Sequence, residues 1–153
     1  VRREKPGTLF GLSPAGGLGW GLGAALGAKL AAPERTIVAT VGDGAYVFTN
    51  PTACHWVAEA FKLPVLTIIF NNSLYGAVRR STLHMFADGA AGINDGRLLA
   101  DLSPSPPYEA LVAAQGGYAR RIERPDDLAE ALRAARHAVT VEKRQALLNV
   151  ICT

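Results

Sequence analysis

Residues 36–44 read TIVATVGDG and residues 65–72 read VLTIIFNN, and these two stretches decide the fold. Each is a short apolar run, rich in β-branched residues, that is followed by a polar turn. This pattern is typical of the buried strands of parallel sheets. Between them, Asn50 and Pro51 form a suitable N-cap and first turn for a helix that we expect to end near Phe61. The stretch therefore predicts a strand, a covering helix and a second strand.

The rest of the chain continues this alternation of helix and strand. We expect helices over residues 16–32, 108–115 and 125–139, and strands over residues 118–122 and 146–152. Residues 81–107 contain several Gly, Asp and Pro and no sustained period, so we expect a long loop there, of the kind that is usually functional or mobile. The order of elements predicts an α/β fold with an open, mostly parallel sheet and helices on both faces.

Size and composition fit one compact domain over residues 1–153. The chain is 49% hydrophobic and 19% charged, which argues against disorder. The formal net charge is only +3 and the arginines are scattered, so no nucleic-acid partner is expected. Cys54 and Cys152 lack the spacing of a metal or redox motif. No apolar run approaches the ~20 residues of a membrane helix, and the start lacks a signal-peptide core, so we expect a cytoplasmic protein without a membrane partner.

Polar residues follow both of these predicted strands, at the carboxyl ends where ligands of α/β sheets bind. Gly42, Asp43 and Gly44 place one carboxylate between glycines that let the backbone approach an anion. The second turn offers Asn71 and Asn72. Carboxylate and amide oxygens suit Mg²⁺, which commonly completes its shell with phosphate oxygens and water. The sequence thus predicts a diphosphate site bridged by magnesium.

The spacing of these two turns resembles a family motif. Gly42-Asp43-Gly44, then 26 residues, then Asn71-Asn72 resembles the motif of thiamine-diphosphate-dependent enzymes. The resemblance implies thiamine diphosphate and Mg²⁺ as cofactors, with the side chains of Asp43 and Asn72 and the carbonyl of Leu74 as metal ligands. It also implies a set of residues that contact the cofactor around the diphosphate: Gly42, Gly44, Ala45 (where the family often has Ser), Tyr75 and Gly76.

A second resemblance lies upstream, in residues 14–21, which read PAGGLGWG. This segment is similar to the one that holds the aminopyrimidine ring in benzoylformate decarboxylases and acetolactate synthases. The resemblance implies cofactor contacts for Gly16, Gly17 and Leu18, with Leu18 beneath the bent cofactor. The run NNSLYGAVR, residues 71–79, is closer to the benzoylformate decarboxylase style, and it implies that Ala77 and Ser81 face the substrate.

What the resemblance implies for function is decarboxylation or carboligation of a 2-keto acid, a lyase or transferase activity. Enzymes of this family take an activating glutamate from a separate pyrimidine-binding domain, and none of the thirteen acidic residues here matches its motif. We therefore assign no catalytic residue within the chain. We expect a fragment or subunit of a larger enzyme, inactive without that domain in the same or another chain, and part of a homo- or hetero-oligomer.

Two other functions stay open at this point. The chain could be a non-catalytic, regulatory module that binds thiamine diphosphate, or a nucleotide-binding α/β domain. The run GGLGWGLG, residues 16–23, is a poor dinucleotide loop because no β-branched strand precedes it. We expect a core or interface role for His55 and Trp56 and a surface position for His84. Arg79 and Arg80 could steer a substrate carboxylate or form structural ion pairs, and we weigh these alternatives equally.

Overall fold

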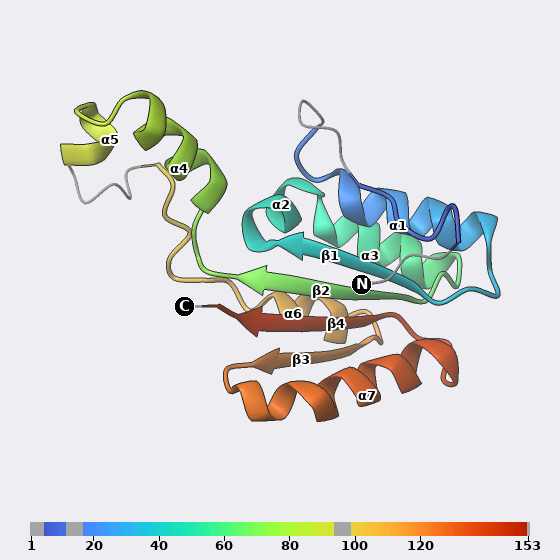
Figure 1. Cartoon of the computed structure of the whole chain (residues 1–153). Coiled ribbons are helices and arrows are strands. Elements are labelled where there is room, and N and C mark those ends of the chain that lie inside the picture. Colours follow the sequence, from blue (N-terminus) through green and yellow to red (C-terminus); the bar gives the residue numbers. More distant parts are fainter. Residues whose placement is uncertain (1–4, 12–16, 94–98, 153) are drawn as a thin grey trace.

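The computed structural model describes residues 5–11, 17–93 and 99–152, and within these ranges the strands form one four-stranded parallel sheet. Its order is β1-β2-β4-β3 (Figure 1). The strands are β1 (Ile37–Gly42), β2 (Val65–Asn71), β3 (Tyr118–Ile122) and β4 (Ala146–Ile151). Every pairing is parallel, which confirms the predicted sheet. All four strands therefore end at the same edge.

Helices cover both faces of the sheet, as predicted. On one face pack α1 (Trp20–Ala31), α3 (Pro51–Ala60) and α6 (Tyr108–Ala113), and on the other packs α7 (Leu128–Thr140), after the short 3-10 turn η1 (Pro125–Asp127). Side chains that alternate along the strands enter the two cores in turn. The core under α7 includes Leu66, Leu148 and Ala135; the opposite core includes Ile69, Leu147 and Leu22.

The face of the sheet that carries α7 is only partly covered. α7 lies over β3 and β4 and reaches β2, at the bottom of Figure 1. At the far side of that face, Val38 of β1 and Phe70 of β2 are 49% and 51% exposed. A continuous core on this face therefore forms only beneath α7.

Two predicted boundaries in the first half of the chain were wrong. Helix α1 begins at Trp20 rather than Gly16, because Gly19 adopts φ 91°, a left-handed conformation that interrupts helical geometry. Asp43 does not lie in an open loop but is the first residue of α2 (Asp43–Phe48), a helix that the sequence did not predict. A carboxylate in the first turn of a helix is stabilised by the helix dipole.

The segment expected to be a long loop, residues 81–107, instead includes the second half of helix α4 (Gly76–Met85) and the whole of α5 (Ala90–Ile93). Neither has a buried residue. Both project beyond the carboxyl ends of the strands, at the upper left of Figure 1. Because no side chain of α4 is selected for a core position, its sequence lacks the apolar period by which a helix is recognised.

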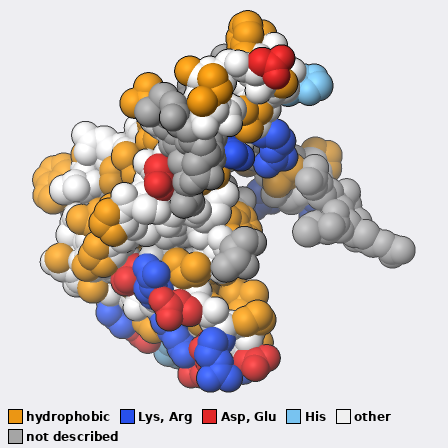
Figure 2. Space-filling model, turned by 90° about the vertical axis from the view of Figure 1, so that its left-hand side faces the viewer, with side chains coloured by type: hydrophobic (Ala, Val, Ile, Leu, Met, Phe, Trp, Pro, Cys, Tyr) orange, Lys and Arg blue, Asp and Glu red, His pale blue; other side chains and the backbone are white. Residues whose placement is uncertain are grey.

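Figure 2 looks onto the carboxyl ends of the strands. Acidic and basic side chains gather in its lower part, over β3 and α7, where Arg120 pairs with Asp127 and Glu130. Hydrophobic side chains are prominent on the projecting segment above, which includes the exposed Val78, Met85 and Phe86. In the described part of the chain, no helix has the length and apolar character needed to cross a membrane.

Candidate functional site at the carboxyl edge of the sheet

The two polar turns predicted to form a site lie next to each other at this edge. In the register of β1 and β2, Gly42 pairs with Phe70. Asp43 and Asn71 therefore follow side by side where the strands end. The adjacency results from parallel pairing, which brings together turns that are distant in the sequence.

Asp43 is a buried carboxylate with spare acceptor capacity. Its side chain belongs to a residue that is only 2% exposed. Among the described residues, Oδ2 accepts one long hydrogen bond, from the amide of Leu74 at 3.3 Å. A carboxylate offers about four acceptor positions. Burying a charge with so few partners is costly, and a bound cation would offset that cost.

Asn72 interacts with the same backbone amide, that of Leu74. Its Oδ1 accepts a hydrogen bond from Leu74 N at 3.2 Å, and the residue is exposed. One N–H therefore points at oxygen atoms of both Asp43 and Asn72. The structure brings together the carboxylate and the amide that the sequence suggested as partners, with the backbone of Leu74 between them.

A strand-like segment holds the Leu74 turn in place. Leu74 forms an antiparallel bridge with Asp101, and Tyr75 N donates to the carbonyl of Ala100 at 2.8 Å. The Leu74 carbonyl accepts a hydrogen bond from Gly76 N at 2.8 Å, at the start of α4. A carbonyl oxygen has two lone pairs, so one remains for a cation.

Asn71 is buried and stabilises the turn at residues 72–74 through its side-chain hydrogen bonds. The sequence did not indicate this structural role. Asn71 is 1% exposed, and its Nδ2 donates to Ser105 Oγ at 2.7 Å and to Asn149 Oδ1 at 3.0 Å. Its Oδ1 accepts from Ser73 N at 3.0 Å. Ser73 has φ 53°, an unusual value outside glycine, and this hydrogen bond stabilises the tight turn that exposes Asn72.

The network continues to α6. Asn149 is fully buried in β4, and its Nδ2 donates to Glu109 Oε2 at 2.8 Å. The sequence did carry a signal for this residue, because Asn149 interrupts an apolar strand, ALLNVI. A polar side chain in a buried strand requires hydrogen-bond partners. That signal alone does not identify those partners, which come from distant segments.

Gly44 is required by its contact with Tyr75. A Cβ at Gly44 would lie 2.5 Å from Cδ1 of the Tyr75 ring. The Tyr75 ring also packs against Phe48, and the two ring centres lie 6.0 Å apart in an edge-to-face arrangement. At Gly42, by contrast, a Cβ would meet nothing within 4 Å. The first glycine thus keeps space open, and the second allows close packing.

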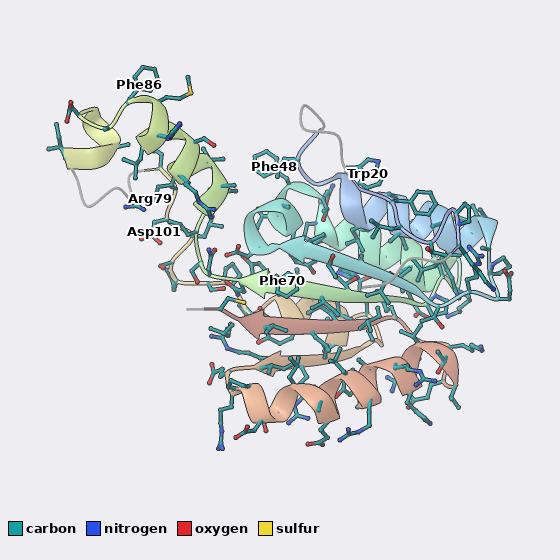
Figure 3. All side chains as sticks on the ribbon, viewed as in Figure 1. Trp20, Phe48, Phe70, Arg79, Phe86 and Asp101 are labelled. Atoms are coloured by element: carbon teal, nitrogen blue, oxygen red, sulfur yellow. The ribbon has the colours of Figure 1, made fainter. Side chains whose placement is uncertain are left out.

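The upstream glycine segment borders the same region. Gly16 lies outside the described residues; Gly17 is exposed and Leu18 is 47% exposed. Gly19 approaches the backbone of Phe48 so closely that a Cβ would lie 2.7 Å from its carbonyl carbon. This approach joins the segment to the end of α2. In Figure 3, Trp20 and Phe48 both point away from the sheet on the same side of the molecule.

The remaining predicted site residues lie on α2 and α4. Ala45 is half-buried in the first turn of α2. Gly76 begins α4, and a Cβ there would lie 3.2 Å from Asn72 Nδ2. Ala77 and Ser81 are exposed on the projecting helix α4. Their exposure leaves them accessible to a ligand or to another protein surface.

His55 lies in the core, one of the two roles predicted for it, whereas Trp56 is exposed and its predicted interface role stays a prediction. His55 is 2% exposed, whereas Trp56 is 60% exposed. His55 Nδ1 donates to Gln145 Oε1 at 2.8 Å, so its Nε2 accepts from the Tyr46 hydroxyl at 2.8 Å. Burial lowers the pKa of His55, and its hydrogen bond to Gln145 opposes this effect. The imidazole is therefore held neutral as a structural group.

The donor set at the edge is carboxylate, amide oxygen and backbone carbonyl. Across the described ranges, no three His, Cys, Asp or Glu side chains gather into a metal cluster. A site that uses a single carboxylate does not need such a cluster. Oxygen donors with open positions for water and phosphate are what Mg²⁺ requires. The residues present thus fit a magnesium ion that shares its shell with a diphosphate.

Comparison with known proteins identifies the family. Residues 1–150 match the family described as thiamine pyrophosphate enzyme, C-terminal TPP binding domain. The chain belongs to this family. The TPP-binding domain is 43% identical over 79 residues to benzoylformate decarboxylase of Pseudomonas aeruginosa, which is 52% of this chain and 14% of that protein. It is 31% identical over 136 residues to acetolactate synthase of Mycobacterium avium, covering 89% and 21%.

A solved structure shares the fold of the TPP-binding domain. The thiamine diphosphate-dependent 4-hydroxybenzoylformate decarboxylase of Rhodococcus jostii superposes with a TM-score of 0.70 and 29% identity. The superposition covers 89% of this chain and 23% of that one. The TPP-binding domain therefore spans less than a quarter of the length of each of these three proteins.

Proposed function

We propose that this domain binds the diphosphate of thiamine diphosphate through Mg²⁺ held by Asp43, Asn72 and the carbonyl of Leu74. One observation carries the proposal: Asp43 and Asn72 both accept a hydrogen bond from the amide of Leu74. Two oxygen donors from distant segments thus converge on the residue that would supply the third. The burial of the Asp43 carboxylate, whose Oδ2 accepts only a long hydrogen bond from Leu74 among the described residues, also supports a cation at this place.

The surrounding residues are suited to the diphosphate. Open space beside Gly42 lets a ligand approach the backbone at the start of α2. In the proposal, Gly42, Gly44 and Ala45 contact the diphosphate from α2, while Tyr75 and Gly76 contact it from the turn before α4. Gly16, Gly17 and Leu18 contact the aminopyrimidine end.

The proposed reaction is decarboxylation of a 2-keto acid or its ligation to a second carbonyl compound. Bound thiamine diphosphate supplies the electron sink for breaking the bond beside the keto group. The proposal is supported by membership of the family and by the names of the similar proteins, which are a decarboxylase and a synthase. Ala77 and Ser81, exposed on α4, are the proposed substrate contacts.

Full activity is proposed to need a partner domain that supplies the activating glutamate. An exposed apolar surface beside the glycine segment supports this requirement, since large exposed apolar patches often mark contact surfaces. Its members are 42–60% exposed: Leu18, Trp20, Val47 and Phe48. The partner would lie in the same or a second polypeptide, and the complex would be a homo- or hetero-oligomer.

Calorimetric titration with thiamine diphosphate, with and without Mg²⁺, tests the binding proposal. We expect binding that requires Mg²⁺ and is lost in Asp43→Ala and in Asn72→Ala. Asn72 is exposed, so its variant retains the fold even where the buried Asp43 variant loses stability. Asp126→Ala, a matched change of an exposed acid near α7, serves as control. Thiamine diphosphate binding that does not depend on Mg²⁺, or that is retained in both site variants, would refute the proposal.

A regulatory module that binds the cofactor without turnover is the alternative function. Co-expression with a glutamate-bearing pyrimidine-binding domain distinguishes the two. The enzyme proposal expects release of CO₂ from a 2-keto acid by the complex and negligible turnover by this domain alone. Cofactor binding without turnover in any such complex favours the regulatory module.

A further inference from the structure

Two buried tyrosines lie in contact beneath the site, but only one of their hydroxyl groups has a hydrogen-bond partner among the described residues. Tyr46 is fully buried and Tyr108 is 2% exposed, with ring centres 5.1 Å apart in an edge-to-face arrangement. The Tyr46 hydroxyl has a partner, His55 Nε2 at 2.8 Å. The Tyr108 hydroxyl has no hydrogen-bond partner among the described residues. A buried hydroxyl without a partner is costly, so its place in the fold needs an explanation.

The ring of Tyr108 packs against that of Tyr46, which lies three residues after Asp43 on α2. Helix residues three apart lie on the same face, so Tyr108 packs beside the turn that begins with the buried Asp43. Burial raises the pKa of Tyr108, and the negative charge of the Asp43 carboxylate raises it further. Ser105 also lies near enough to lower this pKa, although no hydrogen bond of acceptable geometry joins the two residues. Ser105 Oγ instead accepts from Asn71 at 2.7 Å. A buried hydroxyl without a partner thus packs against the short helix that carries the Asp43 carboxylate at its start.

We propose that Tyr108 is a positioning residue for Asp43, and that its hydroxyl donates a hydrogen bond to this carboxylate when a divalent cation is bound. The inference rests on the proposed function. A cation takes one carboxylate oxygen and leaves the other to be satisfied by a donor. Carboxylate ligands of metals are commonly hydrogen-bonded in this way, and loss of such a partner typically weakens metal affinity 10–100-fold.

The two tyrosines provide a matched pair of variants. Tyr108→Phe removes a hydroxyl without a partner, so the urea midpoint of the metal-free protein is expected to stay unchanged or to rise. Tyr46→Phe removes a hydroxyl that donates to His55, so its midpoint without metal is expected to fall. Both variants keep the aromatic packing. The pair thus separates a role in stability from a role in metal binding.

The decisive measurement is calorimetric titration with Mg²⁺ at a fixed concentration of thiamine diphosphate. We expect Tyr108→Phe to weaken the apparent Mg²⁺ affinity about 10-fold, and Tyr46→Phe to change it less than twofold. Wild-type affinity in Tyr108→Phe overturns the inference and leaves the proposed function intact. A fall in the metal-free urea midpoint as large as that of Tyr46→Phe also overturns it. If the wild-type chain binds no Mg²⁺, the proposed function and this inference both fail.

Discussion

The ring of Tyr75 lies directly against the Cα of Gly44, so that a Cβ at Gly44 would lie only 2.5 Å from the ring. This contact joins the two turns of the proposed site independently of any ligand. It ties the first turn of α2 to the residue just before α4. The position of the Leu74 turn therefore depends on the absence of a side chain at Gly44.

The first prediction concerns this contact. Gly44→Ala should lower the free energy of unfolding by about 1–3 kcal/mol, because the methyl group overpacks the contact with Tyr75. Gly42→Ala is the control: its Cβ would meet nothing within 4 Å, and φ −76° suits alanine. Urea unfolding checks both variants. Equal stability of the two would show that the Tyr75 ring moves without cost.

Gly19 and Gly23 give a second matched pair. Gly19→Ala should destabilise the fold by roughly 2 kcal/mol, because φ 91° is unfavourable for alanine and Cβ would lie 2.7 Å from the Phe48 carbonyl carbon. Gly23 lies inside α1 with open space around it, so Gly23→Ala should stabilise by about 0.5–1 kcal/mol. Thermal unfolding should move in opposite directions for the two variants. A shift in the same direction would contradict this account.

The neighbouring asparagines should behave differently. Asn71→Ala should cost about 2–3 kcal/mol of unfolding free energy, because it leaves Asn149 and Ser73 without their buried partner. Asn72→Ala should change stability by no more than about 0.5 kcal/mol, because the residue is exposed. Chemical denaturation without metal measures both. A large loss in Asn72→Ala would mean that the turn depends on Asn72 for its fold.

Acid should destabilise the fold through His55, whose pKa is lowered by burial. The unfolded chain binds a proton near pH 6.5, whereas the folded chain binds it only at lower pH. Stability due to the neutral imidazole is thus complete above about pH 6.5 and is lost as the pH falls from there toward the folded pKa. The loss should be at most about 1.4 kcal/mol per pH unit.

Urea midpoints between pH 7.5 and 5 test this dependence. His55→Gln should be less stable at pH 7.5 but should show a flatter profile between pH 6.5 and 5. His137→Gln, the same substitution at an exposed histidine, serves as the matched control. An unchanged acid profile in His55→Gln would assign the effect to another group.

The strands and the adjacency of the two polar turns were predictable from the sequence. Continuous apolar, β-branched runs predict buried parallel strands, and β3 (Tyr118–Ile122) has the predicted bounds. Helix α3 (Pro51–Ala60) follows from Asn50 and Pro51, although Asn50 adopts a left-handed conformation and makes no side-chain cap. These features were accessible because they depend on local pattern and on the general rule that parallel strands end at one edge.

Helices without a buried face were not predictable in the same way. Helix α4 (Gly76–Met85) has no buried residue, so no apolar period marks it. The short helix α2 (Asp43–Phe48) is held by contacts of Tyr46 with His55 and Tyr108, which come from other elements. Helices as short as α2 are marginal without tertiary contacts. Their existence is thus a property of the folded chain.

The sequence by itself determined the family motif, the alternation of strands and helices that predicts a parallel sheet, and the residue types at the site's edge. Only the tertiary structure decided that Asn71 is buried while Asn72 is exposed, and that Asn149 and Glu109 support the turn from β4 and α6. The physical reason is that a buried polar group must find its partners in space. Those partners lie up to 78 residues away in the chain, where no local pattern can indicate them.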